Sequence, residues 1–342
     1  MTLSPIASHR VPTLSRRELL RRGSLLVGGA LAGSALLSRG LAQAAPAALP
    51  ENSVENENHP IAQMRQSMAQ APIGTTRVGD RHVVFTGAGG NIGLYLGDEG
   101  LVAIDSGSGR EPSTQRLREA IEAVSDKSLR YLVNTHWHFD HTDGNANLHG
   151  LGATIVAHRA VRTRLSSPQV IAFFNAAFPK SGRDALPTLT FEHPIELDLG
   201  NDVLRLVPVT PAHTDSDTIV IFPASNVIQT GDLYFAGSFP FIDSSSGGSL
   251  EGMIRATETI LAATKPDTTL IPGHGPVSTP KDLAATLEML RTVRDRLAPF
   301  QQQGRTLEEV LAAKPLADLD ATWNTGFLGA EAFTRIVYPS KA

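Results

Sequence analysis

The chain has 342 residues, of which 41% are apolar and 19% are charged, and its formal net charge is −4. This composition is typical of a globular protein of enzyme size and excludes fibrous, disordered and polytopic membrane proteins. Because the chain contains no cysteine, disulfide bonds, thiolate metal clusters and a thiol nucleophile are excluded as well. Any metal or acid–base chemistry must therefore use His, Asp and Glu side chains.

The first 44 residues differ in character from the rest of the chain. They are basic at the start, apolar from 24 to 37 and then rich in small residues. The sequence SRRELL at 15–20 resembles a twin-arginine export motif, and AQA at 42–44 resembles a signal-peptidase site. We therefore predict a twin-arginine signal peptide over 1–44, which the twin-arginine export machinery would recognise, and a periplasmic or secreted protein. A retained membrane anchor is disfavoured because the apolar stretch is shorter than the ~20 residues of a spanning helix.

Removal of residues 1–44 takes away six arginines and one glutamate and makes the mature protein more acidic. The remaining 24 basic and 33 acidic residues give a net charge of −9. Such a surface is unsuited to nucleic acid, so we expect a small-molecule substrate and no nucleic-acid partner. Whether the mature chain forms a homodimer is left open by the sequence.

The chain after the signal divides into a lead-in and one large domain. Residues 45–76 are polar and rich in Pro, Ala and Gln, which predicts a flexible lead-in with a short helix around 61–69. The folded domain is expected over 77–342. β-Branched runs between Gly and Asp turns predict strands at 83–86, 92–96, 101–104, 131–133 and 154–157, with an amphipathic helix at 112–124.

The second half of the domain repeats this pattern of strands followed by helices. Strands are expected at 204–209, 218–222, 227–229 and 269–271, and helices near 250–264 and 281–297. Two strand-rich halves that each end in helices predict an α/β fold with helices packed outside two sheets. The segment 166–185 is longer than a tight connection requires, which indicates either a mobile lid or a surface helix.

The most informative segment follows the expected strand at 131–133. It places His136, His138, Asp140 and His141 within six residues, where a chain that turns at the end of a strand can bring them together. Imidazole nitrogen and carboxylate oxygen suit zinc at neutral pH. The mixed sequence of the segment, with Trp, Phe and Asp between the histidines, excludes a simple polyhistidine tag.

Three further polar residues have the same setting, directly after an apolar strand. His213 follows the run at 206–209, Asp232 follows 227–229, and His274 follows 270–271. A sheet holds residues at its strand ends rigidly, while the loops above them shape a pocket. A single such residue would indicate only a hydrogen-bonding role, but together with the dense cluster the three indicate a metal site.

In this pattern the chain resembles the metallo-β-lactamase superfamily, whose five sequential motifs are matched in order over roughly 77–300. Asp105 matches the first acidic position, which is generally structural, and the seven residues above match the other four motifs. The resemblance implies a four-layer αβ/βα sandwich with a dinuclear metal site, so 77–342 is expected to be a hydrolase domain of this fold. It also implies that His136, His138 and His213 bind one zinc ion, that Asp140, His141 and His274 bind a second, and that Asp232 bridges them.

The implied cofactor is two Zn²⁺ ions per subunit, although manganese or iron would also accept these ligands. The implied chemistry is hydrolysis by a hydroxide that the two ions share, with Asp140 as the catalytic residue that orients it and accepts its proton. Differences from particular groups of the superfamily narrow the expected reaction. His138 stands where the di-iron oxygen-reducing members have Glu, which disfavours a redox reaction. Asp232 and Phe235 stand where the largest group of β-lactamases has Cys and Lys, so in this respect the chain resembles lactonase and glyoxalase-type hydrolases more closely.

Aromatic residues near the motifs predict an apolar substrate pocket formed by Phe173, Phe174, Tyr234, Phe235 and Phe239. The expected function is cleavage of a small ester, lactone, thioester or amide, with β-lactams included. A hydrolytic dehalogenase, a phosphodiesterase and a metal-binding protein without turnover are the alternatives. A phosphodiesterase acting on nucleic acid would require a basic groove, which the charge of the mature chain does not suggest.

Overall fold

The computed structural model describes residues 50–200 and 202–338. The predicted signal peptide, residues 1–44, lies outside the described residues. Seven strands form the first sheet in the order β1-β2-β3-β4-β5-β6-β9, antiparallel from β1 to β4 and parallel from β4 to β9. These strands are β1 Gly74–Val78, β2 His82–Thr86, β3 Ile92–Gly97, β4 Gly100–Ile104, β5 Leu129–Asn134, β6 Thr154–His158 and β9 Leu189–Phe191.

The second sheet has five strands in the order β10-β11-β12-β13-β14. Its first four strands pair antiparallel, and the last pair is parallel. Every residue of β13 is buried, as expected for a strand covered on both faces. The strands are β10 Ile195–Asp198, β11 Val203–Pro208, β12 Thr218–Phe222, β13 Val227–Phe235 and β14 Thr269–His274.

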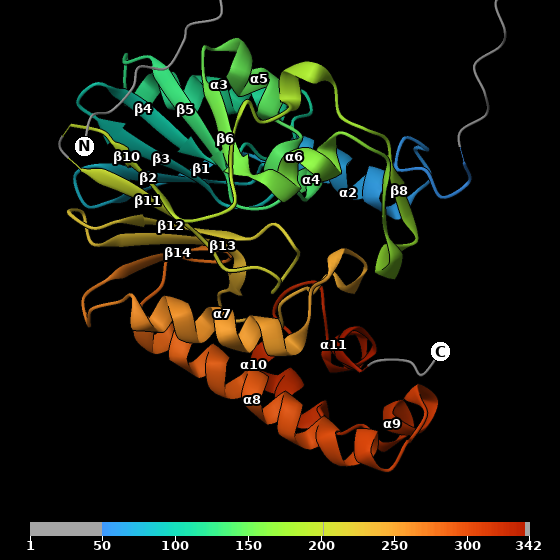
Figure 1. The fold of residues 1–342 in the computed structure, drawn as a ribbon. Coiled ribbons are helices and arrows are strands. Elements are labelled where there is room, and N and C mark those ends of the chain that lie inside the picture. The colour runs from blue at the N-terminus through green and yellow to red at the C-terminus, as the bar shows by residue number, and fades with distance from the viewer. Residues whose placement is uncertain (1–49, 201, 339–342) are drawn as a thin grey trace, which may run out of the picture. The chain divides into compact units, whose positions relative to one another are not determined.

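The two sheets face each other, and helices cover their outer faces (Figure 1). Helices α3 (Ser113–Val124) and α5 (Asn145–Gly150) lie on the first sheet, and α7 (Leu250–Ala262) and α8 (Pro280–Gln302) lie beside the second. Neighbouring residues of one strand enter different layers of the core: Val83 packs with α3, whereas Val84 packs with the second sheet. The predicted four-layer αβ/βα sandwich is therefore confirmed.

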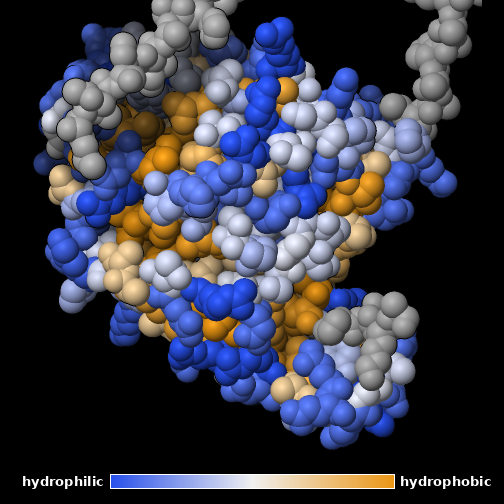
Figure 2. Space-filling model, in the orientation of Figure 1, coloured by the Kyte–Doolittle hydropathy of each residue, from blue (hydrophilic) through white to orange (hydrophobic). Residues whose placement is uncertain are grey.

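Short helices complete the described part of the chain. The outer surface over α7 and α8 is largely hydrophilic (Figure 2), which fits helices that bury only one face. Within the described residues, no helix has both the length and the apolar character needed to cross a membrane. The remaining helices are α4 Phe139–Thr142, α6 Arg159–Leu165, α9 Leu307–Ala313, α10 Asp320–Trp323 and α11 Ala330–Val337, with 3₁₀ turns at Ala172–Phe174, Arg183–Ala185, Ser244–Ser246 and Ala317–Leu319.

The segment predicted as a flexible lead-in, 45–76, is folded from residue 50 on. Helix α2 (Pro60–Gln70) forms close to the expected position, with His59 at its N-cap and Pro60 in its first turn. Val54 and Ile61 are almost fully buried in the main core. The polar composition gave no sign that this helix packs on the core, so the expected flexibility is wrong from residue 50 on and this part of the chain belongs to the domain.

The segment 166–185 forms a hairpin and not the surface helix, one of the two expected structures, while its expected role as a mobile lid stays a prediction. Strands β7 (Gln169–Ile171) and β8 (Ala176–Phe178) pair antiparallel as a small separate hairpin. Phe178 is buried and stacks on Phe139 with ring centroids 5.7 Å apart. The expected surface helix is therefore wrong: the segment forms a short β-ribbon from which Ile171 and Phe178 pack on the domain, whereas Val170 is exposed.

His82 gives the fold a dependence on pH. Its ring is buried between Tyr95 and Phe222, with centroids 5.1 and 4.6 Å away, and burial lowers its pKa from 6.5 to about 4. The unfolded chain therefore binds this proton more tightly than the folded chain below pH 6.5. We expect a loss of up to about 3 kcal/mol in the free energy of unfolding from this group between pH 7 and pH 4.

Urea denaturation of the wild type and of His82→Phe over this pH range measures the effect. The variant keeps an aromatic ring but cannot be protonated, so its stability should fall less steeply with acidification. The same pH dependence in both proteins would show that His82 is not the responsible group.

Candidate metal centre

The loop that follows strand β5 carries four of the seven predicted ligands. β5 ends at Asn134, whose side-chain amide exchanges two hydrogen bonds of 2.9 Å with Asn145 at the start of α5. This exchange ties together the two ends of the connecting segment. All four ligands between these ends are buried, and they are His136, His138, Asp140 and His141.

The second sheet supplies the other three predicted ligands. His213 lies in the loop after β11, Asp232 is part of β13, and His274 is the last residue of β14. Because β13 and β14 are adjacent parallel strands, Asp232 and His274 approach each other at the same end of the sheet. The site therefore lies where strand ends of the two sheets meet, as the sequence pattern predicts.

His136, His138, His213 and Asp232 form a first group of potential ligands. One ligand atom from each lies within 4.8 Å of the others. His213 Nε2 is 2.9 Å from His138 Nδ1, and Asp232 Oδ2 is 3.5 Å from His213 Nε2 and 3.8 Å from His136 Nε2. Three imidazole nitrogens and a carboxylate oxygen thus converge on one point.

Asp140, His141 and His274 form a second group with the same spacing. Asp140 Oδ2 lies 3.5 Å from His141 Nε2 and 3.2 Å from His274 Nε2. The other oxygen of Asp232, Oδ1, is 3.0 Å from His141 Nε2 and 3.4 Å from His274 Nε2. Asp232 therefore directs one oxygen to each group, as expected of a residue that bridges two ions.

Hydrogen bonds from outside the site set which nitrogen each ring presents to it. Asp105 accepts from His141 Nδ1 (2.8 Å), and Phe241 O accepts from His213 Nδ1 (2.8 Å). Thr135 Oγ1 lies 3.1 Å from His136 Nδ1, and Asp243 Oδ2 lies 3.1 Å from His138 Nε2. The nitrogens left to face the site are Nε2 of His136, His141 and His213, and Nδ1 of His138.

The two groups differ in protonation. Burial lowers the pKa of His136 well below its usual value and that of His213 to about 4, so both rings are neutral at pH 7. Burial also acts to lower the pKa of His141 and His274, but the charges of Asp232 and Asp140 outweigh it and raise the pKa of His274 to about 9. A cation bound in the second group would replace the protons on these two rings.

The donor set fits a pair of metal ions. His136 Nε2 is buried and has no hydrogen-bond partner among the described residues, although an unpaired buried nitrogen costs about 1–3 kcal/mol. The backbone also leaves the donors room, since a Cβ at Gly90 would overlap the His141 ring and a Cβ at Gly273 would overlap Asp232. Nitrogen and oxygen donors of this kind suit zinc and other first-row metals.

Asp243 is a supporting residue that the sequence did not single out. Besides the contact with His138, it accepts hydrogen bonds from the hydroxyl groups of Ser245 and Ser246, which fix its orientation. Partners of this kind orient metal-binding imidazoles and strengthen their basicity. We expect Asp243→Ala to weaken zinc affinity by about 10- to 100-fold.

Competition with a chromophoric chelator measures this affinity. Exposed Asp126, in the loop before β5 and thus beyond the strand end opposite to the one that leads into the ligands, provides the matched control, since Asp126→Ala should leave zinc affinity unchanged. Wild-type affinity in Asp243→Ala would contradict the role assigned to this carboxylate.

A cavity of about 510 Å³ opens beside both groups. His138, Asp140, Asp232 and His274 form its polar wall, and Ser238 and Thr325 add two hydroxyl groups. Among the described residues that line it there is no lysine or arginine. Its apolar lining consists of Ile61, Met64, Met68, Phe139, Ile171, Phe174, Phe235, Ala236, Phe241, Pro276 and Phe327.

Two of the five predicted pocket residues line this cavity, namely Phe174 and Phe235. Phe173 is 41% exposed and reaches only the rim, where it contacts Phe174. Tyr234 and Phe239 lie in the core instead, and Phe239 stacks on Phe333 with ring centroids 4.9 Å apart. Because side chains alternate between the two faces of β13, Phe235 faces His274, whereas Tyr234 points to the opposite face.

The sequence reasoning missed the lining contributed by both ends of the domain. Ile61, Met64 and Met68 come from α2, and Phe327 comes from the loop before α11. The spacing of Ile61, Met64 and Met68 is that of one helix face, which was the available signal. Nothing in the local sequence around Phe327 indicates that it returns to the site.

Comparison with known proteins agrees with this geometry. The family model of the metallo-β-lactamase superfamily matches residues 85–274, more than half of the chain. The chain belongs to the metallo-β-lactamase superfamily. A probable metallo-hydrolase of Methanocaldococcus jannaschii is 26% identical to this superfamily member over 196 residues, which cover 56% of this chain and 90% of that protein.

Solved structures show the same fold at low sequence identity. A metallo-β-lactamase from Pontibacter korlensis is 21% identical, with a TM-score of 0.52 over 64% of this chain and 99% of its own. The sec-alkylsulfatase Pisa1 from Pseudomonas sp. is 18% identical, with a TM-score of 0.62 over 79% of this chain. The match covers 51% of the alkylsulfatase, so this superfamily member spans about half of that enzyme.

Proposed function

We propose that this protein is a binuclear zinc hydrolase that cleaves a small, uncharged and largely apolar ester, lactone, thioester or amide, including β-lactams. The observation that carries the proposal is the position of two groups of metal-ligating side chains in the wall of an apolar cavity. Seven buried or half-buried ligands would be costly to maintain without a metal, because each loses hydration on burial. Membership of the superfamily supports hydrolysis as the reaction.

We assign a different role to each group of residues in the site. His136, His138 and His213 would hold one zinc ion, Asp140, His141 and His274 the other, and Asp232 both. Bound zinc supplies Lewis acidity, which lowers the pKa of water and polarises an electrophile. Asp140 lines the cavity as Asp232 does, but its carboxylate belongs to the second group alone, so it is placed to orient a water molecule toward the substrate and to accept its proton.

The cavity lining supports an uncharged substrate. With no lysine or arginine among its described lining residues, the cavity offers no cationic side chain to pair with a carboxylate or phosphate group away from the metal ions. Five phenylalanines instead offer contact to an acyl chain or an aromatic ring, and they are Phe139, Phe174, Phe235, Phe241 and Phe327. This lining argues against phosphodiesters and favours lactones and aryl esters over β-lactams that carry a carboxylate.

Proton release by the zinc-loaded protein tests the proposal. The substrates are lactones, thioesters, aryl esters and β-lactams, with an alkyl sulfate added because of the structural similarity to an alkylsulfatase. We expect the highest kcat/KM for an uncharged substrate with an apolar acyl or aryl group, and no turnover by His138→Ala. Chloride release from aryl halides would identify the dehalogenase alternative. If the protein binds two metal ions but releases no protons from any of these substrate classes, the hydrolase assignment is overturned.

We also propose that the protein is exported through the twin-arginine route before it acts. The motif at 15–20 supports this, and a route that carries folded proteins would allow metal loading before export. Fractionation of cells that express the wild type or a variant with both Arg16 and Arg17 replaced by Lys tests it. The wild type should be recovered outside the cytoplasm with a processed amino terminus, and identical distribution of both proteins would overturn the proposal.

A further inference from the structure

Helix α2 carries an arginine in the middle of its buried face. Ile61, Arg65 and Ala69 follow one another at intervals of four residues and are 1%, 5% and 0% exposed, so they form one stripe along the helix. An apolar residue is expected at the central position, because a charge loses its hydration on burial. Arg65 lies outside the matched region 85–274 and belongs neither to the proposed ligands nor to the lining of the large cavity.

The guanidinium group of Arg65 contacts both ends of the segment that carries two ligands of the second group. Its Nη2 is 2.7 Å from Asp143 Oδ2, and its Cζ is 4.9 Å from the ring centroid of Phe139. Phe139 is the first residue of α4 and Asp143 is its C-cap, so Asp140 and His141 lie between the two contacts. Arg65 therefore reaches both ends of this one-turn helix.

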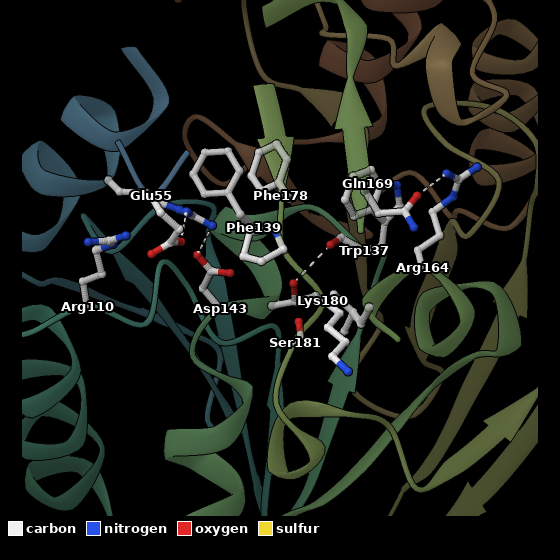
Figure 3. Close-up of a pocket in the computed structure, with 14 residues that line it drawn as sticks. Glu55, Arg110, Trp137, Phe139, Asp143, Arg164, Gln169, Phe178, Lys180 and Ser181 are labelled. Atoms are coloured by element: carbon white, nitrogen blue, oxygen red, sulfur yellow. Dashed lines mark hydrogen bonds and ion pairs between the residues drawn. The ribbon is translucent and has the colours of Figure 1, made fainter. Parts of the chain in front are cut away.

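Further contacts fix the guanidinium group in this position. Its Cζ is 5.2 Å from the ring centroid of Phe178 in β8, and Glu55 Oε1 lies 3.8 Å from Nη1. Phe139, Phe178 and Asp143 gather at one place in the close-up, near Glu55 (Figure 3). A cation at this distance from aromatic faces is attracted to them. The orientation of the arginine is thus set by groups from several segments.

Helix α4 needs support from outside. A single turn of helix, Phe139–Thr142, is too short to be stable by itself. Backbone N–H groups of Gly90 and Ser106 donate to the carbonyl oxygens of its two ligand residues, at 3.1 and 2.9 Å. Phe139 and Asp143 are four residues apart and therefore share a face of the turn, which is the face that contacts the arginine. The turn is held from the first sheet and from α2.

Stability alone does not explain an arginine at this position. A buried ion pair stabilises a fold no better than well-packed apolar side chains of similar volume. Arg65 Nε also has no hydrogen-bond partner among the described residues, which adds to the cost of burying it. A guanidinium group can, however, pair with a carboxylate and lie against aromatic rings at the same time, because it is planar and carries several donors. It can thereby fix the orientation of the segment it contacts.

We propose that Arg65 is a positioning residue for the second metal ion. By holding both ends of α4, it directs Asp140 and His141 toward His274. The inference rests on the zinc binding proposed above. The charge of the arginine by itself has the opposite effect, since loss of a nearby positive charge would strengthen the binding of a metal cation. Weaker zinc binding after loss of Arg65 is therefore evidence of positioning.

Stepwise zinc binding, measured by competition with a chromophoric chelator, tests the proposal. We expect Arg65→Met to bind one zinc ion like the wild type and the other at least about tenfold more weakly. Arg65→Lys should be affected less, because it keeps the charge but lacks the planar group. Arg130→Met is the matched control and should bind both ions like the wild type. Arg130 also lies over a ring, that of Tyr131, and pairs with a glutamate, but at the end of β5 opposite to the ligands.

Two further variants separate positioning from a general loss of stability. Leu204→Ala removes a buried side chain from the core between the sheets, in a cluster that excludes Phe139 and Phe178, so it should lower the melting temperature and leave both zinc affinities unchanged. In a His274→Ala background, Arg65→Met should weaken zinc binding no further, because both changes act on the same ion. An equal loss of affinity in Leu204→Ala would reduce Arg65 to a structural role.

Hydrogen exchange in the zinc-free protein tests the contact without any metal. The amides of 141–143 should exchange faster in Arg65→Met than in Leu204→Ala, because α4 then opens locally. Equal exchange in both variants, or wild-type zinc affinities in Arg65→Met, would overturn the proposal, and Arg65→Lys replaces Arg65→Met in both comparisons if the latter does not fold. A wild type that binds no zinc would instead overturn the proposed function, while the exchange measurement would still decide whether Arg65 holds α4.

Discussion

Replacing Asp140 by Asn lowers kcat on the best substrate by about 10²- to 10⁴-fold, the range expected when a positioned proton acceptor is lost. The amide keeps the size of the carboxylate but cannot accept a proton, and it is a weaker metal ligand. Asp140 is suited to this role because it lines the cavity and lies 3.2 Å from His274 and 3.5 Å from His141. Steady-state kinetics with metal analysis of the same samples measures the effect.

Metal analysis separates the two functions of this carboxylate. His138→Ala should lose bound zinc together with turnover, whereas Asp140→Asn should lose turnover to a greater extent than zinc. Exposed His193 and Asp126 supply matched controls, since His193→Ala and Asp126→Asn make the same chemical changes away from the site. Wild-type kcat in Asp140→Asn would remove Asp140 from the reaction.

Removal of the metal by a chelator should lower the melting temperature by roughly 10 °C, because a ligand that binds only the folded state adds its binding free energy to stability. The geometry explains why the loss is large. His213 Nε2 and His138 Nδ1 are 2.9 Å apart, and His141 Nε2 and His274 Nε2 are 3.4 Å apart, so lone pairs or protons of neighbouring rings oppose each other unless a cation separates them.

Thermal denaturation monitored by circular dichroism, before and after chelation, measures this effect. Addition of two equivalents of zinc should restore the original melting temperature, and magnesium, which prefers oxygen ligands, should not. The His138→Ala variant should show a smaller change on chelation. An unchanged melting temperature in the wild type would mean that the ligands do not hold a metal in the folded protein.

The clustering of the seven proposed ligands could be predicted from the sequence because each lies at or shortly after a recognisable apolar run. The clearest example is His136, His138 and His141 after β5, and Asp232 and His274 follow from the adjacent strands β13 and β14. Short apolar runs locate strand ends well, and strand ends of facing sheets meet. The layers of the fold follow from the same alternation of strands and helices.

The lining of the large cavity could not be predicted in this way, because it depends on which distant segments meet. Tyr234 and Phe235 are neighbours in sequence, yet one lies in the core and the other faces the cavity. Ile61 and Phe327 lie near opposite ends of the domain in sequence and converge only in the folded chain. The chemical character of a single residue does not show which distant residues will lie beside it in the folded chain.

The segments that line the large cavity lie partly outside the region shared with the superfamily. Residues 85–274 contain every metal ligand, whereas Met64, Met68 and Phe327 come from the flanking segments. Changes in these flanks can alter which acyl or aryl group fits without disturbing a single ligand. Part of the lining that would choose the substrate is thus separate from the region that holds the seven proposed ligands, so the flanks can diverge in evolution, or be exchanged by design, while those seven residues stay intact.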